Sequence, residues 1–138
     1  MPKIEENQLF TVIIEWEVNP KYQQELINGL SNQIETYFKD YDGFISASFH
    51  ASEDGKRVIN YAQWISREAW SNSFQASGRE EVQTTNDEII RNCEAKTLKL
   101  NCYSVARVIE NICRNNFLTR ITAENFHYVN YLCISYTA

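Results

Sequence analysis

Two side chains that can donate hydrogen bonds, Asn60 and Trp64, stand four residues apart in a segment that alternates like a β-strand. Side chains alternate between the two faces of a strand, so these two point to the same side. The rest of that face is apolar, and a buried Asn without a hydrogen-bond partner costs about 1–3 kcal/mol. The Asn60 amide and the Trp64 indole N–H are donors that a functional site could use. The alternative is structural: Asn60 would tie down a neighbouring loop and Trp64 would fill the core.

The strand that carries both residues belongs to a predicted β-hairpin over residues 43–65. Asp54-Gly55 is a strong signal for a two-residue type I′ turn, which sets Ala51 opposite Val58. Counting in steps of two, the face of Asn60 and Trp64 also carries Ile45, Ala47, Phe49, Ala51, Val58 and Ala62. The opposite face carries Phe44, Ser46, Ser48, His50, Ile59, Tyr61, Gln63 and Ile65. We therefore expect His50 to be a structural or interface residue.

The segments around the hairpin predict its neighbours. Residues 8–18 alternate as a strand, with Trp16 on the apolar face as a core residue or pocket wall. Asn19-Pro20 predicts a helix start, and an apolar stripe (Tyr22, Leu26, Leu30, Ile34, Tyr37 and Phe38) carries that helix to about Lys39. After the hairpin, Ser66 is a predicted N-cap for a short helix whose face holds Trp70 and Phe74.

Gly78 interrupts the chain before a second helical piece at roughly residues 79–94, and residues 97–109 read as a strand. The run Arg79-Glu80-Glu81 is interpreted as a solvated helix face. The order of elements predicts an α+β protein with the ferredoxin-like βαββαβ arrangement, a four-stranded antiparallel sheet with helices on one side.

The other face of the predicted sheet is also partly apolar, through Ile13, Ile59, Tyr61, Ile65, Tyr103 and Val105. A monomer would expose this surface, so we expect a homodimer with the two sheets face to face. Residues 1–110 form the predicted domain. Residues 111–138 are a C-terminal extension that could be an added strand, an arm across the dimer or a tail.

Composition excludes several classes of function. The 138 residues have a net charge of −5, so no basic surface is available for nucleic acid. No apolar run reaches the ~18 residues of a membrane span, and the N-terminus has no signal-peptide pattern. Cys93, Cys102, Cys113 and Cys133 form no CxxC pair, and His50 and His127 are the only histidines. We therefore expect no metal site, no disulfide framework and a cytoplasmic location.

Several pieces of the hairpin region together resemble a known family. They are Gly43-Phe44, His50, Asp54-Gly55, the run from Val58 to Trp64, and then Ser66 and Glu68. This pattern is similar to the antibiotic biosynthesis monooxygenase superfamily of dimeric α+β barrels. The similarity is densest over residues 10–74, and the topology it implies extends to about residue 109.

The resemblance implies a chemistry. Quinone-forming members oxidise aromatic polyketide anthrones with O2 and need no metal or flavin, and Asn60 and Trp64 match the pair associated with their active site. We therefore expect no cofactor, a small aromatic substrate together with O2, catalytic roles for Asn60 and Trp64, and a binding wall of Trp16, Phe49, Trp70 and Phe74. Some members also use a Tyr and an Arg. Trp70 stands where that Tyr would be, and Arg67 and Arg107 are the candidate cations.

Three other functions fit the same fold. A non-enzymatic dimeric barrel would bind a small apolar ligand and release it unchanged, and a polyketide cyclase-like enzyme would act without O2. Haem degradation is disfavoured, because it needs a His ligand on the helix after Trp64 and residues 66–94 contain none.

Overall fold

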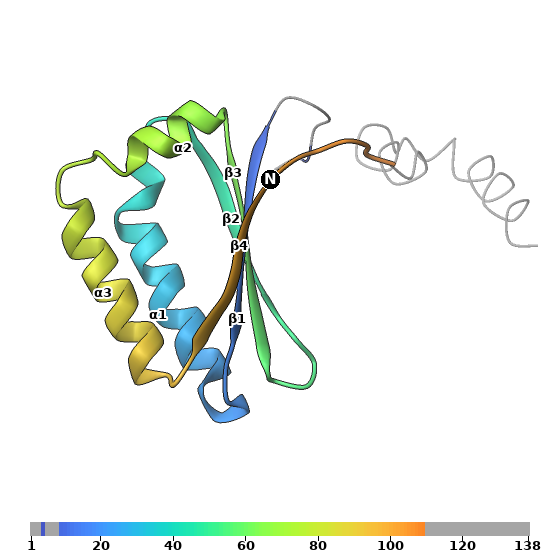
Figure 1. The fold of residues 1–138 in the computed structure, drawn as a ribbon, viewed down its shortest axis with the longest axis vertical. Coiled ribbons are helices and arrows are strands. Elements are labelled where there is room, and N and C mark those ends of the chain that lie inside the picture. Colours follow the sequence, from blue (N-terminus) through green and yellow to red (C-terminus); the bar gives the residue numbers. More distant parts are fainter. Residues whose placement is uncertain (1–3, 5–8, 110–138) are drawn as a thin grey trace, which may run out of the picture. The chain divides into compact units, whose positions relative to one another are not determined.

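The computed structural model describes residue 4 and residues 9–109 of the chain. The elements in order are β1 (Phe10–Glu17), η1 (Pro20–Tyr22), α1 (Gln23–Thr36), η2 (Phe38–Asp40), β2 (Phe44–Ala51), β3 (Arg57–Trp64), α2 (Arg67–Ser73), α3 (Arg79–Asn92) and β4 (Lys96–Ser104). The strands form one antiparallel sheet in the order β2-β3-β1-β4. The helices of the described residues cover one side of this sheet (Figure 1). The predicted ferredoxin-like fold is therefore confirmed.

All of these elements lie within one compact unit, Met1–Arg107. The predicted extension, residues 111–138, falls outside the described residues, so its role stays a prediction. The predicted final strand is shorter than expected, because β4 ends at Ser104 and residues 105–109 are irregular.

Asn19 and Pro20 start the first helical segment as predicted, with the Asn19 Oδ1 accepting a hydrogen bond from the Lys21 N–H at 3.1 Å. Leu26 and Leu30 of α1 are buried against the sheet in the main core. The expected continuous helix to Lys39 is wrong, because α1 ends at Thr36 and a 3-10 turn follows. Tyr37 at the junction leaves helical geometry (φ −120°) and is 47% exposed, so it does not belong to the apolar stripe.

The hairpin has the predicted pairing but a different turn. Ala51 pairs with Val58 and Phe49 with Asn60. The loop is wider than two residues, because Gly55 N–H donates to the Ser52 carbonyl and Ser52 N–H donates to the Arg57 carbonyl, both at 3.1 Å. Gly55 has φ +77° but Asp54 does not have a positive φ, so the expected type I′ turn is wrong. Asp54 stabilises the wider loop by accepting from Ser52 Oγ and from the Lys56 N–H.

A β-bulge near the start of β2 changes the faces at that end of the hairpin. The register of β2 against β3 shifts between Phe44 and Ser46, which pairs Phe44 with Trp64 and leaves Ile45 unpaired. The expectation that Ile45 shares the face of Asn60, with Phe44 on the opposite face, is therefore wrong. His50 lies beyond the bulge, pairs with Ile59 and keeps its predicted face.

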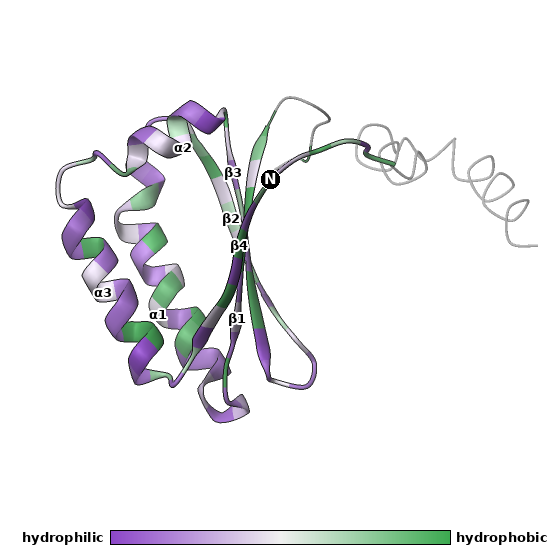
Figure 2. Ribbon diagram, viewed as in Figure 1, coloured by the Kyte–Doolittle hydropathy of each residue, from purple (hydrophilic) through white to green (hydrophobic). Residues whose placement is uncertain are grey.

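The second helical region divides at Gly78, as predicted. The Ser66 Oγ caps α2 by accepting from the Ala69 N–H at 3.0 Å. Gly78 adopts a left-handed conformation and precedes α3. Figure 2 shows that α3 is mostly hydrophilic, whereas the strands carry long hydrophobic stretches. No helix in the described part of the chain has the length and hydropathy to span a bilayer.

Candidate functional site

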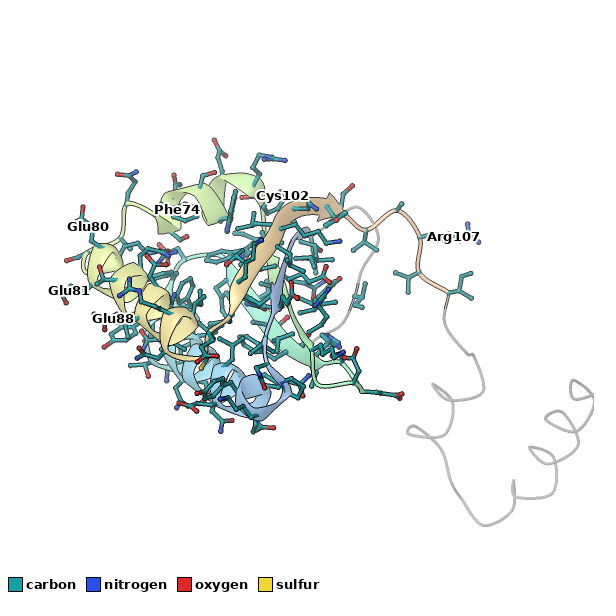
Figure 3. All side chains as sticks on the ribbon, turned by 60° about the horizontal axis from the view of Figure 1, so that its bottom comes forward. Phe74, Glu80, Glu81, Glu88, Cys102 and Arg107 are labelled. Atoms are coloured by element: carbon teal, nitrogen blue, oxygen red, sulfur yellow. The ribbon has the colours of Figure 1, made fainter. Side chains whose placement is uncertain are left out.

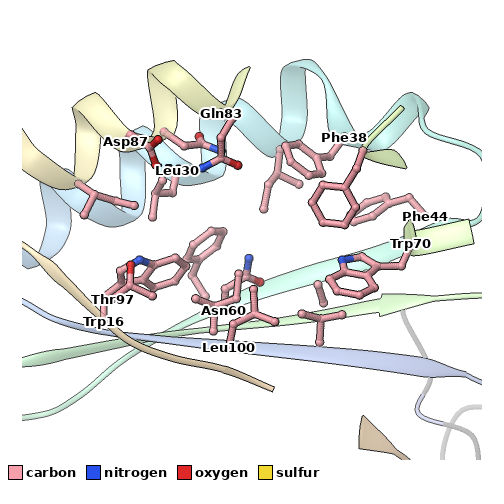
Figure 4. Close-up of a pocket in the computed structure, with 18 of the residues that line it drawn as sticks. Trp16, Leu30, Phe38, Phe44, Asn60, Trp70, Gln83, Asp87, Thr97 and Leu100 are labelled. Carbon is pink, nitrogen blue, oxygen red and sulfur yellow. Dashed lines mark hydrogen bonds between the residues drawn. The ribbon is translucent and has the colours of Figure 1, made fainter. Parts of the chain in front are cut away.

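A cavity of about 230 Å³ lies between the helix-facing side of the sheet and the helices (Figure 4). The sheet contributes mainly aromatic and aliphatic side chains, and α3 contributes mainly polar ones. The lining residues are Val12, Ile14, Trp16, Leu30, Ile34, Phe38, Phe44, Phe49, Asn60, Ala62, Trp64, Trp70, Phe74, Arg79, Gln83, Asn86, Asp87, Ile90, Thr97 and Leu100.

The cavity has a closed side and an open side. Trp16, Asn60 and Trp64 are buried, and they belong to the central strands β1 and β3. In contrast, Gln83 and Asp87 of α3 and the lining residues of the edge strand β4, Thr97 and Leu100, are exposed. The mouth of the cavity therefore opens between α3 and β4.

All six residues that the sequence suggested for the site line this one cavity: Trp16, Phe49, Asn60, Trp64, Trp70 and Phe74. Asn60 and Trp64 are 6% and 2% exposed. Four of the lining rings form two edge-on pairs, Phe44 with Trp64 at 5.3 Å and Phe74 with Trp70 at 5.1 Å between ring centres. The structure thus brings these residues together, while their roles in binding and catalysis stay predictions.

Asn60 rises from the middle of the sheet into the cavity (Figure 4). Its cross-strand neighbours are Phe49 on β2 and Ile14 on β1, and neither side chain offers a hydrogen bond. The Asn60 Oδ1 is buried and has no hydrogen-bond partner within the described residues. The Trp16 Nε1 is in the same condition. An acceptor and a donor on the closed side of the cavity are thus available to a ligand.

Arg79 is a cavity residue that the sequence interpretation missed. Its guanidinium lies over the Phe38 ring at 4.8 Å and over the Phe74 ring at 5.1 Å. Burial lowers the pKa of Arg79 from its ordinary value, and the neighbouring Tyr41 opposes this effect. The interpretation of Arg79-Glu80-Glu81 as a solvated face holds for Glu80 and Glu81, which are exposed on the outer side of α3 (Figure 3), and is wrong for Arg79.

The two cations suggested by the sequence do not line the cavity. Arg67 lies over the Phe10 ring at 4.9 Å, and Arg107 lies beyond the end of β4, away from the helices (Figure 3). A helical spacing could have found the correct residue, because Arg79, Gln83, Asn86, Asp87 and Ile90 recur at intervals of three and four and all face the cavity.

Only some of the polar side chains that α3 contributes to the cavity have hydrogen-bond partners within the described residues. Gln83 Nε2 donates to the Asp87 Oδ1 at 2.9 Å, one helical turn away. The Asn86 Oδ1 is buried and has no partner within residues 9–109. These groups can bind the polar substituents of a ligand whose rings lie against the sheet.

Other chemically active side chains lie away from the cavity. Cys93 is buried, and this burial, with a smaller contribution from Glu25, raises the pKa of its thiol. The His50 ring lies 3.2 Å from Ser48 Oγ on the sheet face that the helices leave uncovered. Among the described residues, no group of three or more His, Cys, Asp or Glu side chains could hold a metal ion.

Comparisons with known proteins agree with this architecture. The tetracenomycin-F1 monooxygenase of Streptomyces glaucescens is 45% identical over 58 residues, which are 42% of this chain and 52% of that protein. The match thus spans about half the length of that relative.

Among solved structures, the monooxygenase from the gene ActVA-Orf6 of Streptomyces coelicolor, in complex with nanaomycin D, aligns with a TM-score of 0.61 and 27% identity. That alignment covers 74% of this chain and 91% of the other. SnoaB, a cofactor-independent oxygenase from Streptomyces nogalater, shares the fold with a TM-score of 0.57 at 13% identity, over 75% of this chain and 99% of its own.

A sequence profile described as "Antibiotic biosynthesis monooxygenase" matches residues 9–85. This segment includes β1, the hairpin, α2 and the first turns of α3, and thus most of the residues that line the cavity. The chain belongs to the antibiotic biosynthesis monooxygenase family.

Proposed function

We propose that the protein is a cofactor-independent monooxygenase that oxidises a phenolic, polycyclic, anthrone-like polyketide substrate with O2. The observation that carries this proposal is the buried Asn60 amide in an aromatic cavity. Its Oδ1 has no hydrogen-bond partner among the described residues. A buried acceptor of this kind costs stability unless a ligand satisfies it. The names of the relatives, a tetracenomycin-F1 monooxygenase and a monooxygenase in complex with nanaomycin D, support the same class of substrate.

The walls of the cavity suit flat, fused rings. Trp16, Phe49, Trp64 and Trp70 offer ring faces and edges against which an aromatic substrate can stack. The cavity volume of about 230 Å³ is below the roughly 300–1,000 Å³ of common ligand pockets. A polycyclic substrate would therefore extend through the mouth between α3 and β4, with its reacting ring on the closed side.

The reaction needs electrons, and in this proposal an ionised phenol or enol of the substrate supplies them to O2. One CH2 group of an anthrone-like substrate becomes C=O and takes one oxygen atom, while the second oxygen atom leaves as water with both hydrogens. The Asn60 Nδ2 and the Trp64 Nε1 would donate hydrogen bonds to the substrate oxyanion. The Asn60 Oδ1 would accept a hydrogen bond from a substrate hydroxyl. The buried surroundings strengthen these interactions, because they exclude water.

Oxygen uptake separates this proposal from its alternatives. A cyclase-like enzyme would transform the substrate without consuming O2, and a non-enzymatic binding protein would release the ligand unchanged.

We also place the protein in the cytoplasm, which suits the free thiols of Cys93 and Cys102.

The test is the Asn60→Ala variant, assayed with an anthrone substrate in an oxygen electrode. The wild type should consume O2 and form the quinone, and the variant should lose about 10²–10³-fold in kcat. Its unfolding free energy should stay within about 1 kcal/mol of wild type, because the amide it removes has an unpartnered acceptor.

Asn101→Ala is the matched control, because Asn101 is a strand residue of β4 that does not line the cavity. This variant should keep the wild-type rate. No acceleration by the wild type, or an unchanged rate in Asn60→Ala, would refute the proposal.

A further inference from the structure

Arg79 is the one Lys or Arg among the residues that line the cavity. Its Nε and Nη1 are buried and have no hydrogen-bond partner within the described residues. No carboxylate of the described residues forms an ion pair with it, since the ion pairs found there involve Arg57 and Lys99. A buried charge is normally paired, so an unpaired one at a cavity wall indicates a group that the ligand must bring.

The surroundings of Arg79 leave a defined position for that group. The rings of Phe38 and Phe74 lie against the guanidinium at 4.8 and 5.1 Å, and both rings line the cavity. The rings attract the charge of the guanidinium but have no oxygen acceptor for its N–H groups. The planar fork of N–H donors matches the two oxygens of a carboxylate.

The other end of the cavity has the opposite charge. Asp87 lies eight residues beyond Arg79 on α3, which is about 12 Å along the helix axis. Asp87 accepts a hydrogen bond from Gln83 and would repel a second carboxylate. In Figure 4, Asn60 lies between the Asp87 end and the end marked by Phe38 and Trp70. The charges of the wall therefore define a direction for a bound ligand.

We propose that Arg79 binds an anionic substituent, a carboxylate carried on the fused-ring substrate, at the Phe38 and Phe74 end of the cavity. The substrate class is thus an aromatic polycyclic acid, held by its carboxylate at a distance from the ring that reacts beside Asn60. This inference rests on the proposed function for the reaction, but the binding of the carboxylate can be measured without it.

The experiment compares two probes that differ only in charge, 9,10-anthraquinone-2-carboxylate and 9,10-anthraquinone-2-carboxamide. Both are already oxidised, so binding requires no turnover. The three tryptophans of the chain, Trp16, Trp64 and Trp70, all line the cavity, so quenching of their fluorescence reports occupancy. Wild type should bind the carboxylate roughly tenfold more tightly than the carboxamide.

Three variants identify the residue responsible. Arg79→Gln should bring the two affinities within about twofold by weakening the carboxylate alone, and Arg79→Lys should keep part of the preference because it keeps the charge. Arg67→Gln is the matched control, since Arg67 also stacks on a ring, that of Phe10, but does not line the cavity. This control should keep the full preference.

Equal binding of the two probes by wild type would overturn the inference. An equal loss of affinity for both probes in Arg79→Gln would also overturn it, because that result would mark Arg79 as a structural residue. Thermal unfolding of each variant identifies a folding defect. If Arg79→Gln is defective, the inference is tested instead by whether Arg79→Lys still prefers the carboxylate probe. The proposed oxygenase reaction is tested separately by oxygen uptake. A preference for the carboxylate probe without oxygen uptake refutes only the reaction. Oxygen uptake without that preference refutes only the binding of a carboxylate by Arg79.

Discussion

At Trp64 the indole ring contributes packing and its N–H group contributes a hydrogen-bond donor, and a substitution can separate the two. The ring packs edge-on against Phe44 at 5.3 Å and is almost fully buried, so it contributes to the core as well as to the cavity wall. The N–H group contributes one donor that phenylalanine lacks. A substitution that keeps the ring and removes the donor therefore tests the chemical role without emptying the core.

We predict that Trp64→Phe lowers kcat for anthrone oxidation by about 10-fold to 10²-fold, since one oxyanion donor is lost. Its melting temperature should fall only slightly, because most of the apolar surface stays. Trp70→Phe serves as the comparison, and its effect should appear mainly in KM, since Trp70 belongs to the stacking wall. Stopped-flow formation of the quinone measures both variants. A wild-type kcat in Trp64→Phe would leave this residue with a packing role only.

At the scale of elements, the entry into β2 depends on a glycine in a conformation that other residues avoid. Gly43 has φ +79°, and its carbonyl accepts from the Ile65 N–H at 2.8 Å. A Cβ at this position would lie 2.5 Å from the Ala69 Cβ on α2 and 2.7 Å from the Ile65 side chain. The bulge that places Phe44 in the cavity starts at the next residue, so Gly43 helps to position the aromatic wall.

We predict that Gly43→Ala destabilises the protein by about 2–5 kcal/mol, the sum of left-handed strain and overpacking. Gly78→Ala is the matched control, with nearly the same φ (+77°) and no atom within 4 Å of the added Cβ. It should lose only the conformational part, about 1–2 kcal/mol. Urea unfolding of both variants measures the difference. Equal losses would show that the contact with Ala69 relaxes without cost.

At the scale of the whole molecule, the sheet face without helices is the surface that the expected homodimer would use. Charged side chains also lie on this face, where Glu15 pairs with Arg57 and with Lys99, at 3.7 and 3.1 Å. Apolar side chains remain there, including Ile13 at the centre and Tyr103, which is 45% exposed. The homodimer stays a prediction.

We predict that the wild type sediments as a dimer and that Ile13→Glu shifts it toward monomer, since a charge at the centre of an interface must be desolvated. Gln24→Glu adds the same charge on the exposed side of α1 and should leave the mass unchanged. Analytical ultracentrifugation at several concentrations provides the measurement. A monomeric wild type would contradict this prediction.

The sequence by itself determined the order of elements, the pairing of the hairpin and the face shared by Asn60, Trp64, Trp16 and Phe49. These features follow from local periodicity and capping, which act between residues that are near in the chain. Only the tertiary structure decided that Phe44, not Ile45, faces the cavity, because a bulge changes side-chain parity without a local signature. It also decided that Arg79 lies in the cavity, because a charge at the start of a polar helix is usually solvated. Here α3 packs beside Phe38 and Phe74, which buries part of the Arg79 guanidinium. That guanidinium has no carboxylate partner among the described residues.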